Sequence, residues 1–146
     1  MSFDLKSATP DTTLPFNGVI FGADSQSAAS PSVYPAYVLL GVPQSSKSAD
    51  YTLTLTDGGT HILHPASDAN ARTFTIPANA SVAFPIGSVV TFINAGGALT
   101  IAINSDTLYL AGTAGSTGGR TLAAYGIASA IKISSTSWVI SGTNLT

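Results

Sequence analysis

The sequence has no cysteine and no glutamate, and charged residues make up only 8% of its 146 positions. Without cysteine the chain forms no disulfide framework and offers no thiolate to a metal ion. An average soluble domain carries about 25% charged residues, so this chain takes its polarity from Ser, Thr, Asn and Gly instead. Thr favours strands and the other three favour turns, and the composition therefore predicts an all-β protein.

Basic residues are few and scattered: the chain has five Lys or Arg and a formal net charge of −2. Nucleic-acid binding relies on clustered Lys and Arg that release counterions from phosphates, so we expect no nucleic-acid partner. No apolar run approaches the roughly 18 residues of a membrane span, and the first residues lack the apolar run of a signal peptide. We therefore expect no membrane partner and synthesis in the cytoplasm. A charge-poor surface also favours packing against other proteins.

The clearest structural pattern lies in residues 72–103. Phe74 and Ile76 alternate with threonines, and residues 99–103 repeat the alternation with Leu and Ile. A side-chain period of two is typical of half-buried antiparallel strands. A similar run from Tyr51 to His64 is interrupted by Asp57-Gly58, which predicts a β-hairpin at that point.

These patterns predict about nine or ten short strands along residues 49–146, with no helical period. No internal repeat of 20–50 residues is evident, so the sequence does not predict a solenoid. Strands at regular spacing are typical of sandwiches and barrels. We predict an antiparallel β-sandwich or jelly-roll-like domain over residues 49–146, preceded by an extended N-terminal arm over residues 1–48.

The arm is predicted from five prolines that interrupt residues 1–48 between short apolar segments. Neither a long helix nor a long strand tolerates that proline density. Apolar anchors on an extended segment suit docking onto another subunit, often by strand addition. The alternative is that these segments add edge strands to the same domain. The predicted anchors are Phe3, Leu5, Leu14, Phe16, Ile20, Phe21, Tyr34 and Tyr37.

No catalytic, cofactor-binding or metal-binding constellation emerges from the sequence. His61 and His64, three residues apart on a predicted strand, point to opposite faces and cannot chelate one metal together. Asp68 and Asn70 offer only two neighbouring oxygens, whereas calcium takes 6–8. Aspartates at turns are explained by hydrogen bonds to their own backbone. The sequence therefore predicts a protein that is not an enzyme and carries no cofactor.

Three aromatic residues are candidates for stacking against a sugar: Trp138, Tyr109 and Tyr125. Trp138 alternates with small polar residues in the last predicted strand. That position favours a role in closing the core over a role as a binding platform.

The stretch from Arg72 to Gly142 resembles a β-rich module of bacteriophage virion proteins, including tail fibres, head fibres and capsid decoration (cement) proteins. The resemblance rests on FTIPANASVAFPIGSVVTFINAG, the DTLYLAG-like strand with its Gly-rich loop, and the closing TSWVISG. The segment FGADSQSAASPSVYP also looks like the start of small phage structural proteins. The resemblance implies a virion structural component, commonly a homotrimer in such families.

The length then favours the capsid over the tail, because a tail fibre normally carries a long shaft, repeats or a coiled coil. The resulting hypothesis is a decoration or head-fibre protein on the outer capsid surface, assembled in the host bacterial cytoplasm. Its arm would bind the major capsid protein. The alternative is a tail-associated adhesin that recognises a host glycan through Trp138, Tyr109 or Tyr125. A third hypothesis, a glycan depolymerase, lacks a recognisable pair of catalytic carboxylates.

Overall fold

The computed structural model describes residues 21–22, 32–33 and 41–146 of the chain. It separates into two units, residues 1–41 and 42–146. In the first unit, β1 (Phe21–Gly22) pairs antiparallel with β2 (Ser32–Val33). The predicted anchors lie outside the described residues, apart from the backbone of Phe21 in β1. The sequence placed the domain boundary after residue 48, whereas the first strand of the second unit already begins at Gln44.

The second unit is made almost entirely of strands, and the one helical segment among its described residues is the short 3-10 turn η2 (Leu55–Asp57). The prediction of an all-β protein is therefore confirmed. The strands are β3 (Gln44–Ser46), β4 (Tyr51–Thr52), β5 (His61–His64), β6 (Arg72–Ile76), β7 (Val89–Asn94), β8 (Leu99–Ile103), β9 (Thr107–Leu110), β10 (Arg120–Ser134) and β11 (Ser137–Leu145).

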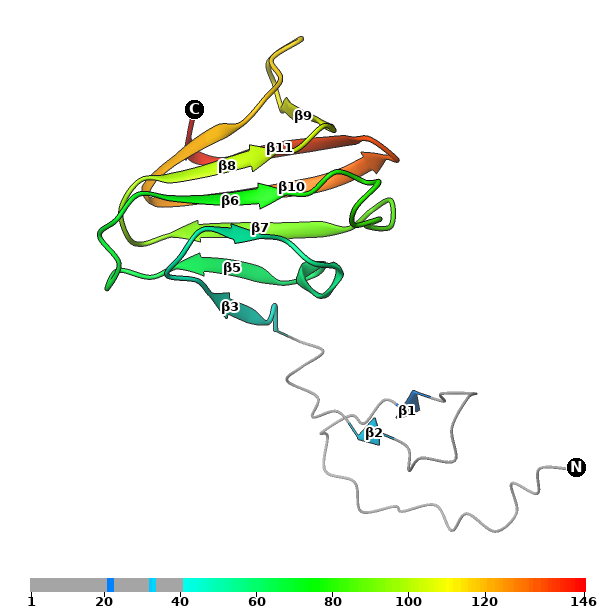
Figure 1. Cartoon of the computed structure of the whole chain (residues 1–146), viewed down its shortest axis with the longest axis horizontal. Helices are drawn as coiled ribbons and strands as arrows, with labels where there is room; N and C mark the ends of the chain where they lie inside the picture. The colour runs from blue at the N-terminus through cyan, green and yellow to red at the C-terminus, as the bar shows by residue number, and fades with distance from the viewer. Residues whose placement is uncertain (1–20, 23–31, 34–40) are drawn as a thin grey trace, which may run out of the picture. The chain divides into compact units, whose positions relative to one another are not determined.

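Successive strands alternate between two parallel stacks, as in a short solenoid (Figure 1). Strands β3, β5 and β7 pair in parallel in one stack, and β4, β6 and β8 pair in parallel in the other. The chain thus places one strand in each stack, turns a corner, and repeats. The register is regular: Ile62 lies opposite Phe92 in one stack and Phe74 opposite Ile101 in the other.

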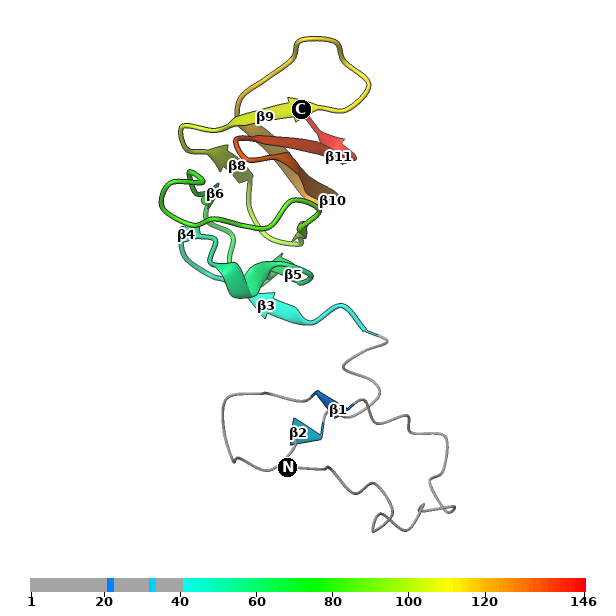
Figure 2. The same cartoon turned by 90° about the vertical axis from the view of Figure 1, so that its right-hand side faces the viewer.

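Strand β10 closes the last coil by pairing antiparallel with both stacks. Figure 2 shows β10 beside β8 and β11. The first residues of β10, from Arg120, pair with β8, and its later residues, from Gly126, pair with β7. Between the two segments the chain bends at Tyr125, whose φ of 60° lies in the left-handed region. Strand β11 then pairs antiparallel with β10, and β9 pairs in parallel with β11.

The predicted antiparallel sandwich or jelly roll is not the arrangement found, because five of the eight strand pairs in this unit are parallel. A period of two tells which side of a strand is buried, and it does so equally for parallel and antiparallel neighbours. The sequence also lacks a repeat that would have predicted a solenoid. The three coils share a topology, but their connecting loops differ in length.

The hairpin predicted at Asp57-Gly58 is also wrong, for a local reason. The Asp57 carboxylate accepts hydrogen bonds from the backbone N–H of Thr54 (2.7 Å) and the hydroxyl of Tyr51 (2.8 Å), which winds the chain into η2. A type I′ hairpin needs positive φ at both central residues, yet Gly58 has a φ of −60°. The chain therefore crosses to the other stack instead of returning along β4.

The core fills the space between the two stacks and beneath β10. Phe74 and Ile76 of β6 are buried, as their alternation with threonine predicted. Large side chains of β7 lie beside small ones of β10 in the interior: Val90 is opposite Ala130, and Phe92 is opposite Ala128. Burying one such large side chain contributes about 1.5–3 kcal/mol to stability. The buried hydrophobic residues are Leu53, Ile62, Phe74, Ile76, Phe84, Val90, Phe92, Leu99, Ile101, Leu108, Leu122, Ala128, Ala130, Trp138 and Ile140.

Candidate functional site

The three aromatic candidates for sugar stacking do not form one platform. Trp138 is fully buried and packs edge-to-face on Phe84, with ring centroids 5.4 Å apart, which confirms its role in the core. Tyr109 is exposed on β9 and Tyr125 is 83% exposed at the bend of β10. A stacking platform needs an accessible ring face, so the structure leaves only the two tyrosines for this role.

The two tyrosines also lie apart from each other. Tyr109 is opposite Val139 in β11, which in turn is opposite Ile131 in β10. Tyr125 precedes Ile131 by six positions, which corresponds to roughly 20 Å along a strand. A single sugar ring does not bridge that distance, so the tyrosines are separate surface features.

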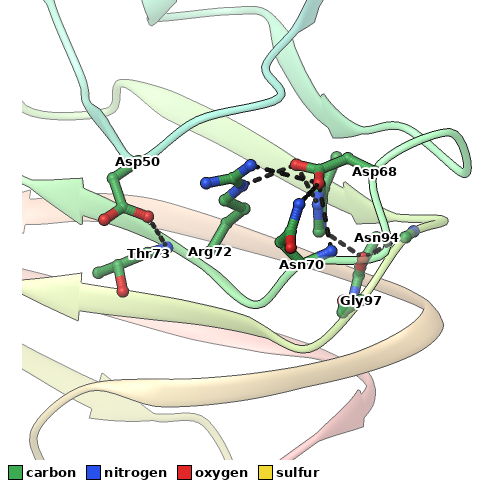
Figure 3. A network of polar contacts seen from close by, with 9 residues as sticks. Asp50, Asp68, Asn70, Arg72, Thr73, Asn94 and Gly97 are labelled. Atoms are coloured by element: carbon green, nitrogen blue, oxygen red, sulfur yellow. Dashed lines mark hydrogen bonds and ion pairs between the residues drawn. The ribbon is translucent and has the colours of Figure 1, made fainter.

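A polar cluster, buried at His64, Asp68 and Asn94, instead occupies the corner where the chain passes from one stack to the other (Figure 3). We call it the polar corner; its members are His64, Asp68, Asn70, Arg72 and Asn94. Arg72 donates from Nε to Oδ2 of Asp68 (2.7 Å), and Asn70 donates from Nδ2 to Oδ1 (2.7 Å). Arg72 holds the pKa of the Asp68 carboxyl well below its usual range, against the opposing effect of burial. Both carboxylate oxygens are thus engaged by the protein itself.

His64 joins this carboxylate to the next corner of the coil. The side-chain amide of Asn94 donates to the carbonyls of Gly97 and Leu122 (2.8 Å each), which fixes its oxygen toward His64. The His64 ring lies between that oxygen, 3.0 Å from Nδ1, and Asp68 Oδ2, 3.3 Å from Nε2. Both ring nitrogens face acceptors, so the ring makes both hydrogen bonds only when it is doubly protonated.

The polar corner is built to hold two chain crossings together. The amide of Gly96 donates to Asn94 Oδ1 (3.0 Å), and a Cβ at Gly97 would lie 2.5 Å from the carbonyl oxygen of Asn70. Glycine is required where two backbones approach this closely. His61, on the opposite face of β5, instead contacts Gln44 through Nε2 (3.1 Å). Within residues 41–146 no three His, Asp, Glu or Cys side chains gather as metal ligands would.

A second unusual group is Lys132, which lies near the end of β10 and exposes only 1% of its surface. Its Nζ donates to Oδ1 of Asn79 (2.5 Å) and lies 5.6 Å from the centroid of the Trp138 ring. The only ion pairs in the described part of the chain are those of Asp68 with His64 and Arg72, so Lys132 has no carboxylate partner there. Buried lysines are rare unless they are paired.

Part of the surface described by the structure is apolar. We call it the isoleucine face; it consists of Ile127, Ile131 and Ile133 on the outward side of β10. Each of the three is between 43% and 51% exposed. Val89 of β7 and Val139 of β11 lie opposite Ile131 on its two sides, which widens the face across three strands. Contiguous exposed apolar groups on a folded domain indicate a protein interaction site.

Sequence reasoning missed Lys132, the isoleucine face and the polar corner. Lys132 and the isoleucine face could have been predicted from the alternation of side chains along β10. Lys132 lies an even number of positions from Ala128 and Ala130, so a strand that buries these alanines also buries the lysine and exposes the isoleucines. No such pattern exists for the polar corner, because His64 and Asn94 are 30 residues apart.

Comparisons with known proteins leave the chain without a family. No protein-family model matches it, and neither a curated protein nor a solved structure gives a match. No helix in the described ranges has the length and apolar character needed to cross a membrane. What the structure defines is an all-β, solenoid-like unit with a closing antiparallel strand.

Proposed function

We propose that this protein is a non-enzymatic structural component of a bacteriophage virion, a capsid decoration or head-fibre protein. In this proposal the N-terminal arm, shortened from residues 1–48 to residues 1–41 because β3 belongs to the second unit, binds the major capsid protein on the outer surface of the shell. The β-strand unit assembles as a homotrimer. The sequence resemblance over residues 72–142 supports the virion assignment. The observation that carries the assembly role is the isoleucine face.

The isoleucine face supports assembly because exposed isoleucines on a regular sheet cost solubility unless they are covered. Only 8% of the residues are charged, so two copies of the chain repel each other weakly when such faces meet. On a shell under internal pressure, many copies that bridge neighbouring subunits add their contacts together. Such multivalent attachment gives stable binding even where each contact is weak.

The test is a comparison of the full chain with a variant that lacks residues 1–41. This deletion spares β3, which pairs with β5 and belongs to the second unit. Both proteins are incubated with virions or capsids from which the protein has been removed, and then sedimented. The full chain is expected to sediment with the particles and the shortened chain to stay in solution. Equal binding of both would contradict the role assigned to the arm.

A further inference from the structure

We propose that Lys132 and Asn79 form an intramolecular isopeptide bond, which ties β10 to the loop of residues 77–88. The inference does not depend on the proposed function. It rests on the placement of an amine, an amide and a carboxylate in one semi-buried cluster within the second unit.

The two reacting groups are already in contact. Nζ of Lys132 lies 2.5 Å from Oδ1 of Asn79, closer than the range of about 2.7–3.2 Å for ordinary N–H···O hydrogen bonds. Because a C=O bond is about 1.2 Å long, Nζ is no farther than about 3.7 Å from the amide carbon Cγ. Reacting atoms in a near-attack arrangement are about 3–3.5 Å apart, and such proximity accelerates reaction strongly.

The surroundings hold both groups in place and shield the Lys132 side chain from water. Lys132 exposes only 1% of its surface, and its amine lies over the buried ring of Trp138. The backbone of Lys132 is clamped by the same loop that carries Asn79: Gly87 donates to its carbonyl (2.8 Å), and its N–H donates to Ser88 (2.9 Å).

A carboxylate stands beside the amide. Oδ2 of Asp106 accepts a hydrogen bond from the backbone N–H of Asn79 (3.0 Å). In the reaction the neutral amine of Lys132 attacks Cγ of Asn79, the Nζ–Cγ bond forms, and the Cγ–Nδ2 bond breaks. Asp106 takes a proton from the attacking nitrogen and returns it to the departing nitrogen, which leaves as ammonia. The step requires neither an oxidant nor a reductant.

Mass spectrometry of the full chain tests the bond directly. Trypsin cleaves after Arg72, Arg120 and Lys132, so an unmodified chain releases peptides 73–120, 121–132 and 133–146. We expect peptide 73–120 to be joined to 121–146, uncut at Lys132, with a mass about 17 Da below the sum of the two because ammonia has left. Recovery of free peptide 121–132 from protein kept folded for days, with no joined product, would overturn the proposal.

Variants distinguish the isopeptide bond from other reactions that release ammonia. Asn79→Ala and Lys132→Met each remove one reacting group, and both are expected to show the full sequence mass. Asp106→Asn keeps an oxygen that accepts the Asn79 N–H but does not relay a proton, so we expect joined peptide to accumulate at least tenfold more slowly. A mass deficit that persists in Asn79→Ala, or one confined to an unjoined peptide such as that containing Asn17-Gly18, would assign the loss to asparagine cyclisation and overturn the proposal.

Discussion

Asp68 shows how a single side chain stabilises the crossing between the two stacks. It accepts from Arg72 and Asn70, and it lies 3.3 Å from the buried ring of His64. Losing one partner of such a cluster leaves the others buried without compensation, which costs more than the hydrogen bond itself contributes. We therefore regard the polar corner as a structural element of the solenoid-like unit.

The lowered pKa of Asp68 gives a prediction about acid stability. Arg72 favours the ionised carboxylate in the folded state, so the stabilisation is present above the ordinary pKa of aspartate and is lost as the pH falls toward the lowered value. In Asp68→Asn this pH-dependent part is missing. We expect the difference in free energy of unfolding between the two proteins to be largest at pH 7 and to shrink at about pH 3.

Urea unfolding of both proteins at the two pH values measures this difference. Asp50→Asn is a suitable control, because its carboxylate accepts a single exposed hydrogen bond, from Thr73. A difference for Asp68→Asn that stays constant between pH 7 and pH 3 would contradict the assigned ion pair.

At the scale of strands, β10 is the element that holds the unit together, since it pairs with β7, β8 and β11. To reach both stacks it bends between Leu122 and Ile127, where its register with β11 shifts. The bend places Tyr125 at a φ of 60°. A residue other than glycine adopts this left-handed conformation at a cost of roughly 1–2 kcal/mol. The side chain of Tyr125 is almost fully exposed and gains little from packing there.

We therefore expect Tyr125→Gly to stabilise the protein by up to about 1 kcal/mol, because glycine adopts positive φ without strain. The free energy of unfolding from urea titration measures the effect. Ala124→Gly is the matched control: position 124 has no positive φ, so the added backbone freedom should destabilise it by about 0.5–1 kcal/mol. A loss of stability in Tyr125→Gly equal to the control would show that the tyrosine ring makes contacts that matter.

The identity of the strands was predictable from the sequence, and their partners were not. The alternation of Phe74 and Ile76 with threonines gave the position and the buried side of β6. Nothing in that pattern distinguishes a neighbour in a parallel stack from one in an antiparallel hairpin, and Asp57 formed a side-chain hydrogen bond where a hairpin turn was expected. The pair formed by Lys132 and Asn79 spans 53 residues, so only the folded chain reveals it.

At the scale of the whole molecule, the isoleucine face gives a prediction about assembly. Ile131 lies at its centre, flanked by Val89 and Val139 on the neighbouring strands. We expect Ile131→Asp to convert the proposed trimer into a monomer with an intact fold, since a buried unpaired carboxylate at an interface costs several kcal/mol. Size-exclusion chromatography with light scattering measures the mass in solution, and circular dichroism verifies the fold.

Leu55→Asp provides the control for this experiment, because Leu55 is an even more exposed aliphatic residue on η2, outside the sheet. It should leave the oligomeric state unchanged. A wild-type protein that is monomeric at high concentration would contradict the role of the isoleucine face in self-assembly.

The measurement that tests the central claim most directly is immunogold labelling of intact phage particles with an antibody raised against residues 42–146. A decoration or head-fibre protein predicts gold distributed over the capsid. Labelling confined to the tail, or particles without label, would contradict the proposed place of this protein on the capsid surface.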